Sequence, residues 1–99
     1  MPGSEPGYRL SPLARTDLED IWRYTFKNWS LEQADRYHGT IMTAIRALAD
    51  GSVSGSRADV REGYFKLSAG SHVLFYRKTN TTLEIMRILH QRMDVGRHL

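Results

Sequence analysis

Two arginines and one histidine lie close together near the C-terminal end of the chain, in the run EIMRILHQRMD (residues 84–94). Arg87, His90 and Arg92 could serve a ribonuclease that works without a metal, because an imidazole can transfer protons and guanidiniums can stabilise charge on a phosphate. They could equally bind an anionic partner. The run predicts a strand in which Arg87 and His90 face opposite sides, and this disfavours a shared phosphate.

A nuclease would need further cations around His90, and the candidates are Arg61, Arg77 and Arg87. Arg77 and Arg87 fall at otherwise apolar positions of alternating runs, where an arginine commonly packs its stem and extends its head to water or a carboxylate. A histidine at a strand end is commonly a hydrogen-bonded structural group. Arg61 could fasten its loop to the sheet through an ion pair. Each residue therefore has a structural role that competes with target binding.

The residues after this strand are expected to form an exposed basic tail. Arg92 and Arg97 lie in that tail and are the better candidates for contact with a target. Met93 either anchors the tail in the core or offers an adaptable apolar contact. The complete target-binding set that we predict is Arg61, Arg77, Arg87, His90, Arg92, Met93 and Arg97.

Several other chemistries are disfavoured by the residues present. The four histidines are scattered, at positions 38, 72, 90 and 98, without the close spacing of a metal site, and there is no cysteine. The run GSVSGS (51–56) is not followed by Lys-Ser or Lys-Thr, as a phosphate loop would be. We therefore predict no metal and no cofactor.

Length and composition predict one domain. The chain has 99 residues, 40% of them hydrophobic, with a net charge of +3 and a pI near 9.5. The basic excess lies in the C-terminal half. No apolar run approaches the ~20 residues that cross a bilayer, and the start of the chain does not read as a signal peptide. We expect a flexible segment over residues 1–7, a single domain over residues 8–99, and a cytoplasmic location.

The elements that must position these residues begin with a short strand over 8–11 and a helix over 12–28. Ser11 can cap that helix and Pro12 suits its first position. A second helix starts after Ser30, within the capping sequence SLEQ, and stops at Gly51. Only two residues separate the helices, which predicts an antiparallel hairpin. Trp22 and Trp29 are expected in its core and at its elbow.

Three alternating runs follow a polar loop at 51–63. They cover 64–69, 71–78 and 83–90, and the tight turns between them predict an antiparallel meander. In the last run Leu83, Ile85, Arg87 and Leu89 are expected on one face, opposite Glu84, Met86, Ile88 and His90. The fold class predicted is α+β: a two-layer sandwich of order β-α-α-β-β-β, with the helical hairpin packed on a mostly antiparallel four-stranded sheet.

The sequence resembles the ParE toxins of the RelE/ParE toxin superfamily over about residues 8 to 99. The resemblance rests on YRLSPLARTDLEDIWRYT (8–25), WSLEQADRY (29–37), RADVREGY (57–64), GSHVLFYR (70–77) and above all RILHQRMD (87–94). The β-α-α-β-β-β fold of that superfamily agrees with the order reached above.

The resemblance implies the toxin of a type II toxin–antitoxin pair, which inhibits DNA gyrase and so blocks replication. It implies a non-catalytic inhibitor without cofactor, whose target is gyrase alone or gyrase with its bound DNA. It also implies a ParD-type antitoxin as partner, through which alone operator DNA would be contacted. Apolar residues of the two helices, namely Leu18, Trp22, Tyr37 and Ile41, are expected to line the groove for that antitoxin.

The competing interpretation is a RelE-like nuclease that cuts mRNA in the ribosome. Those relatives carry basic residues from the loop after the second helix through the strands, and a Tyr or His near the C-terminus. Here the loop over 51–63 has no lysine and no Tyr follows the last strand, so His90 alone supports the nuclease. An incomplete acid–base set loses roughly 10²–10⁴-fold of rate. We therefore favour gyrase inhibition.

Overall fold

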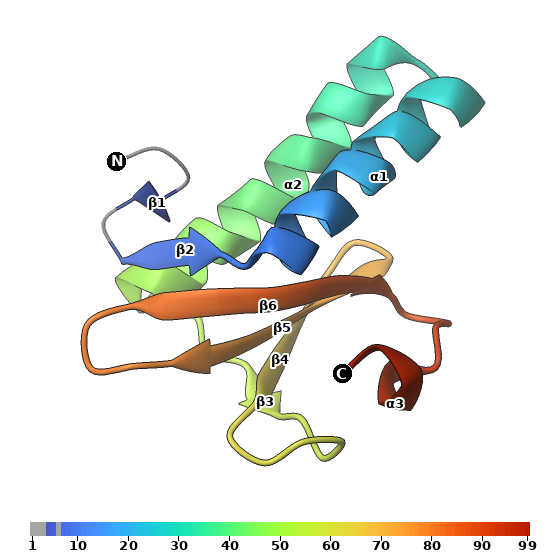
Figure 1. Ribbon diagram of the computed structural model, residues 1–99. Coiled ribbons are helices and arrows are strands. Elements are labelled where there is room, and N and C mark those ends of the chain that lie inside the picture. Colours follow the sequence, from blue (N-terminus) through green and yellow to red (C-terminus); the bar gives the residue numbers. More distant parts are fainter. Residues whose placement is uncertain (1–3, 6) are drawn as a thin grey trace.

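The computed structural model describes residues 4, 5 and 7–99, and it has two layers, a helical hairpin and a mixed sheet (Figure 1). In chain order the elements are β1 (Ser4–Glu5), β2 (Tyr8–Leu10), α1 (Pro12–Asn28), α2 (Leu31–Asp50), β3 (Ser56–Arg57), β4 (Phe65–Ala69), β5 (His72–Lys78), β6 (Leu83–His90) and α3 (Val95–His98). The predicted α+β class and the β-α-α-β-β-β order of the main elements are confirmed.

The sheet has the strand order β1-β2-β6-β5-β4-β3, and only the β2–β6 pair is parallel. Four strands were predicted; the structure adds the two-residue strands β1 and β3 at the edges. The strand β1 falls within the segment expected to be flexible, of which residues 1–3 and 6 lie outside the described residues. That flexibility stays a prediction.

Both long helices begin and end where the sequence indicates. The Ser11 hydroxyl accepts a hydrogen bond from the Ala14 N–H at 3.0 Å, and the Ser30 hydroxyl accepts one from the Gln33 N–H at 3.0 Å. Gly51 ends α2 at φ 83°, a left-handed conformation that glycine adopts without strain. These local signals explain where the two helices begin and where the second one ends.

The start of α1 covers an edge of β6 that no strand covers. Only Leu83, Glu84 and Ile85 of β6 pair with β2. Beyond them, the Ser11 hydroxyl donates to the Met86 carbonyl at 2.7 Å, and an Asp17 carboxylate oxygen accepts from the Ile88 N–H at 2.9 Å. This arrangement holds the N-terminal half of α1 against the C-terminal half of β6.

Each face of the sheet carries an apolar cluster. The larger cluster lies between the sheet and the hairpin, and its fully buried members include Ile41, Ile45, Leu74 and Ile85. The smaller one lies on the opposite face and consists of Ala58, Tyr64, Phe75 and Leu89, with Val73, Met86, Val95 and Leu99 packed against it. The short helix α3 thus packs Val95 and Leu99 against the sheet, while most of the C-terminal tail is exposed, as predicted.

A bulge in β6 changes which residues share a face. Phe75 pairs with Arg87, but the next residue, Tyr76, pairs with Ile85, so that Met86 is an extra residue. As a result Leu83, Ile85 and Ile88 all belong to the hairpin-facing cluster, while Leu89 belongs to the other. The simple alternation predicted for this strand is therefore wrong beyond Ile85.

Candidate functional site

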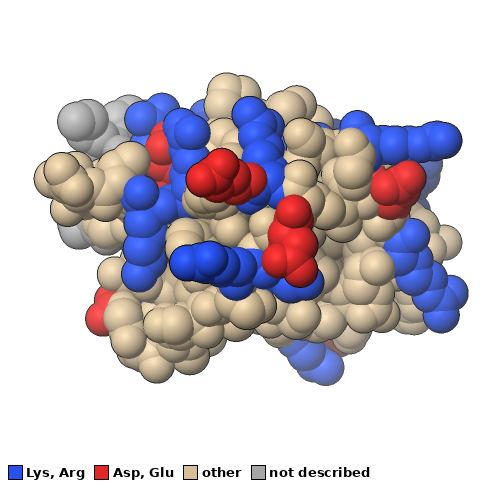
Figure 2. Space-filling view, turned by 90° about the horizontal axis from the view of Figure 1, so that it is seen from below, with Lys and Arg blue, Asp and Glu red and all other residues tan. Residues whose placement is uncertain are grey.

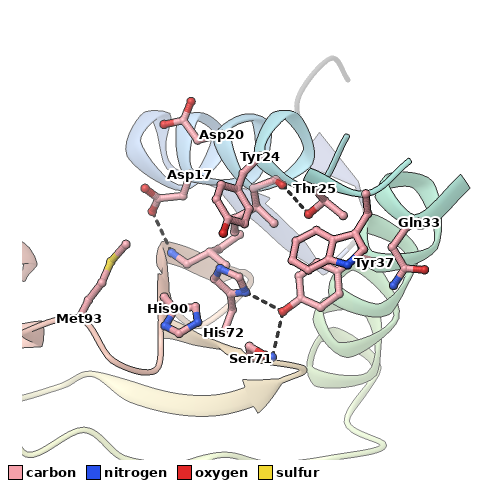
Figure 3. A pocket seen from close by; sticks show the side chains of 13 residues that line it. Asp17, Asp20, Tyr24, Thr25, Gln33, Tyr37, Ser71, His72, His90 and Met93 are labelled. Atoms are coloured by element: carbon pink, nitrogen blue, oxygen red, sulfur yellow. Dashed lines mark hydrogen bonds between the residues drawn. The ribbon is translucent and has the colours of Figure 1, made fainter. Parts of the chain in front are cut away.

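A groove of about 570 Å³ opens between the hairpin and the end of the sheet where β5 begins and β6 finishes. Its walls are largely apolar and aromatic. Figure 3 shows Tyr37, His72 and Ser71 joined by hydrogen bonds, with His90 beside them. The lining residues are Asp17, Asp20, Ile21, Tyr24, Thr25, Trp29, Gln33, Tyr37, Ser71, His72, Ile88, His90 and Met93.

The charged side chains that line this groove are acidic. They are Asp17 and Asp20, and none of the described lining residues is Lys or Arg. Because a phosphate site requires cations or several converging N–H donors, this lining does not suit a phosphate group. In residues 4, 5 and 7–99 there is also no cluster of three His, Asp or Glu side chains placed to hold a metal ion.

A hydrogen-bonded pair, Tyr37 and His72, joins α2 to β5. The Tyr37 hydroxyl oxygen lies 2.6 Å from His72 Nδ1 and accepts a hydrogen bond from the Ser71 N–H at 2.9 Å. Gly70 makes room for the tyrosine ring: at φ +61°, a Cβ on Gly70 would lie 2.6 Å from Tyr37 Cε1. The turn between β4 and β5 and the ring of Tyr37 therefore fit together only with glycine.

His72 and His90 face each other across the β5–β6 pair. They are directly paired in the register, and their ring centroids lie 5.3 Å apart with an interplanar angle of 87°. Burial, and secondarily the neighbouring His90, lowers the pKa of His72 from 6.5 to about 4. His72 is consequently neutral at physiological pH.

The Arg87 guanidinium is held by Asp17. Arg87 Nε donates to Asp17 Oδ2 at 2.8 Å and Nη2 donates to Oδ1 at 2.9 Å, and both side chains are largely buried. Its Nη1 donates to the His98 carbonyl at 3.1 Å. The hydrogen bonds to Asp17 raise the pKa of Arg87 above its ordinary value. This network ties α1, β6 and α3 together, which gives Arg87 a structural role.

The other predicted target-binding residues lie mostly outside the groove. Arg77 pairs with Glu84 at 3.3 Å, and Arg61 stacks over the Tyr64 ring at 5.0 Å. Arg92 and Arg97 are exposed, as expected. Only His90 and Met93 of that set line the groove. Figure 2 shows Lys and Arg side chains spread over the side turned away from the hairpin, with a few acidic ones among them.

The four residues predicted for the antitoxin differ in exposure. Leu18 and Ile41 are buried in the core under the hairpin, so the expectation that they line an open groove is corrected. Trp22 is partly exposed, stacks on Phe26 and donates from Nε1 to Asp35 at 3.0 Å. Tyr37 lines the groove. Their helical spacing identified an apolar stripe, and most of that stripe faces the sheet.

Sequence reasoning missed other residues of the groove. Trp29, expected at the elbow, stands there with 67% of its surface exposed, and Tyr24 beside it is 61% exposed. Both line the groove, as does His72. For Tyr24 the available signal was its position off the apolar stripe of α1, because a large aromatic residue on the polar face of a helix commonly marks an interaction surface. Trp29 follows the last residue of α1, and its sequence position indicated only the elbow.

The fold is shared with solved structures. The chain aligns with one from the "Chromosomal ParDE TA system from P. aeruginosa" at a TM-score of 0.76 and 17% identity, covering 86% of this chain and 95% of that one. It also aligns with a YafQ mutant from E. coli at a TM-score of 0.58 and 13% identity, covering 88% of this chain and 94% of that one. The chain therefore shares the fold of these two structures.

Sequence comparison identifies the family. The model for "ParE toxin of type II toxin-antitoxin system, parDE" matches residues 8–95. The chain is 48% identical to "Toxin ParE1" of Mycobacterium tuberculosis over 94 residues, covering 93% of this chain and 96% of that one. It is 41% identical to "Toxin ParE1" of Caulobacter vibrioides over 93 residues, with the same coverage. The chain belongs to the ParE toxin family.

Proposed function

We propose that this toxin inhibits DNA gyrase without catalytic residues of its own, and that a ParD-type antitoxin neutralises it. The observation that carries the proposal is the family match over residues 8–95, which includes the string RILHQRMD (87–94). Gyrase is a cytoplasmic enzyme, so the toxin acts in the cytoplasm, and it would contact operator DNA only through the antitoxin.

The arrangement of the cations supports a non-catalytic role over the RelE-like nuclease. His90 pairs with His72 at one end of the β5–β6 hairpin, whereas Arg77 pairs with Glu84 near the other end. Arg87 is bound to Asp17, and no described Lys or Arg lines the groove beside His90. General acid–base cleavage of RNA needs cations within contact of the same phosphate as the histidine. None of the described groove-lining residues gives His90 such a cation, and Arg92, whose N–H bonds His90 Nδ1, is exposed and does not line the groove.

Two assays on the purified toxin separate the functions. A gyrase inhibitor stops supercoiling by purified gyrase and leaves mRNA on the ribosome intact. A nuclease cuts ribosome-bound mRNA and leaves supercoiling unchanged, and replacing His90 then abolishes the cleavage. Cleavage of mRNA together with normal supercoiling would refute the proposal.

The groove and the adjoining tip of the hairpin support an antitoxin surface. Trp29, Tyr24, Phe26 and Leu31 are each 47–67% exposed around this tip. Such a group of large apolar side chains suits the apolar face of an amphipathic helix. We therefore place the antitoxin along the groove and over this tip.

Replacing Trp29 tests that surface. We expect Trp29→Ser to weaken binding of the separately purified ParD-type antitoxin by more than tenfold, because large aromatic anchors contribute about 2 kcal/mol or more at interfaces. Leu13→Ser is the matched control, since Leu13 is 58% exposed at the start of α1 and does not line the groove. Isothermal titration calorimetry measures both, and equal losses in the two variants would contradict the placement.

A further inference from the structure

We infer that His72 and His90 present two neighbouring Nε2–H donors in the groove, which bind uncharged carbonyl oxygens of an apolar peptide segment. The inference rests on the proposed antitoxin groove for the identity of its partner. The site itself follows from the hydrogen bonds that the two imidazoles make on their other nitrogen.

The tautomer of His90 is fixed by its own chain. The Arg92 N–H donates to His90 Nδ1 at 3.1 Å. A backbone N–H can only donate, so Nδ1 carries a lone pair and the proton of the neutral ring is on Nε2. His90 therefore offers a donor and not a base at Nε2.

The tautomer of His72 follows from Tyr37. The Tyr37 oxygen already accepts the Ser71 N–H, and its hydroxyl hydrogen has no other acceptor than His72 Nδ1 among the described residues. We therefore assign the hydroxyl as the donor to Nδ1, an assignment that leaves the ring proton on Nε2 and that the histidine spectra described below test. Because burial keeps His72 neutral, its Nε2–H is an uncharged donor.

Both Nε2 atoms keep some exposed surface. Neither has a hydrogen-bond partner among residues 4, 5 and 7–99, and within those residues no polar side-chain atom is both buried and unpaired. Both histidines line the groove. The two N–H groups are consequently available to a bound molecule.

The charges around the two donors select the kind of acceptor. Asp17 is already paired with Arg87 and Asp20 with Arg23, and no Lys or Arg is among the described lining residues, so the groove offers no free cation to a carboxylate or phosphate. A metal ion would need a lone pair on Nε2, but in both rings this nitrogen carries the proton, so the pair does not suit a metal. An uncharged carbonyl matches the donors, and the walls formed by Ile21, Tyr24, Trp29 and Ile88 match apolar side chains. A peptide segment supplies both.

Nuclear magnetic resonance of the folded full chain tests the tautomers. Histidine ¹⁵N spectra at neutral pH should show protonated Nε2 and unprotonated Nδ1 for both rings. The Nδ1–H tautomer in either ring would overturn the inference without any consequence for gyrase inhibition.

Three probes that share a phenyl ring on a four-carbon chain, and differ in the group at its end, test the ligand class. We expect 4-phenylbutanamide to shift the Nε2 signals of His72 and His90, and 4-phenylbutanoate and 4-phenylbutylamine to bind at least threefold more weakly. Equal or tighter binding of the carboxylate, or no histidine shift with the amide up to its solubility limit, would overturn the inference.

A matched pair of substitutions isolates the donors. His90→Asn keeps an oxygen that can accept the Arg92 N–H but removes the atom at the Nε2 position, whereas His90→Gln restores an N–H donor there. Amide binding should fall roughly threefold to tenfold in the Asn variant, as expected for one lost hydrogen bond, and should remain near the wild-type value in the Gln variant. Equal binding by both variants would overturn the inference, and His38→Gln on α2 serves as a control outside the groove.

Discussion

Asp17 binds three N–H groups of β6 with one carboxylate: two from the Arg87 side chain and one from the Ile88 backbone. The sequence indicated Arg87 as an arginine at an apolar position whose head reaches water or a carboxylate, and the structure has the carboxylate of Asp17 there. The sequence alone could not identify which carboxylate binds Arg87, because Asp17 lies 70 positions away from it and the local pattern around Asp17 does not distinguish this residue from Asp20.

Replacing Asp17 tests this role. We expect Asp17→Asn to lower the free energy of unfolding by roughly 2–4 kcal/mol, since it leaves a largely buried guanidinium without its anion and weakens a backbone contact. Urea denaturation measures the change. Asp20→Asn, at an exposed position on the same helix, should change stability by less than about 0.5 kcal/mol; similar losses in both variants would remove Asp17 from this role.

His72 predicts a pH dependence. The unfolded chain takes up a proton near pH 6.5, but the folded chain takes it up only near pH 4, so stability is lost as the pH falls through that window. After allowance for solvent screening at the groove, we expect a loss of about 1–2 kcal/mol from this residue.

Urea denaturation at both ends of the window measures this loss. His72→Gln should lose less stability than the wild type, because glutamine does not titrate. His38→Gln, outside the groove, should behave as the wild type does. Parallel losses in all three proteins would mean that the carboxylates alone account for the acid sensitivity.

Most elements of the fold could be predicted because each is marked locally. Ser11 and Ser30 cap the two helices, Gly51 ends the second, and alternation marks β4, β5 and β6. The bulge at Met86 could not be predicted, since it depends on how β6 pairs with β5. The helix α3 is too short for periodicity, although Asp94, whose carboxylate accepts the Gly96 N–H, is a cap that the sequence displays.

The turn between β4 and β5 must approach α2 closely, and Gly70 allows this. We expect Gly70→Ala to lower the free energy of unfolding by roughly 2–4 kcal/mol, from the left-handed backbone and from contact with the Tyr37 ring. The control is Gly63→Ala: Gly63 has φ +82° but open space around its Cβ position, so only about 1–2 kcal/mol should be lost. Thermal or urea denaturation gives both values, and equal losses would exclude a contribution from Tyr37.

At the scale of the whole molecule, the basic excess lies away from the acidic groove. We therefore expect the exposed arginines of the C-terminal tail to contact the target outside the groove, whereas His90 and Met93 of the predicted target-binding set line the groove in which the antitoxin is proposed to bind. The sequence could suggest this only as a charge imbalance between its two halves. The exposed Arg92 and Arg97 remain the predicted contacts with the target, because neither is fixed by a buried partner.

The double variant Arg92→Ala/Arg97→Ala tests these contacts. We expect its inhibition of gyrase supercoiling to weaken roughly fivefold or more, as the loss of two complementary surface charges would do. Arg36→Ala/Arg46→Ala removes the same charge from exposed positions on α2 and should leave inhibition unchanged. If both double variants weaken equally, net charge rather than the tail determines inhibition.

The edges of the sheet affect whether strands of other copies of the protein can add to it. Within the described residues, both outermost strands have only two residues, and the free stretch of β6 is occupied by Ser11 and Asp17. A long bare edge would template the addition of further strands and lead to fibres or precipitates. Here the described free edges are short, namely the two-residue strands β1 and β3 and the stretch 67–69 of β4 that β3 does not cover, so each offers little length for such growth.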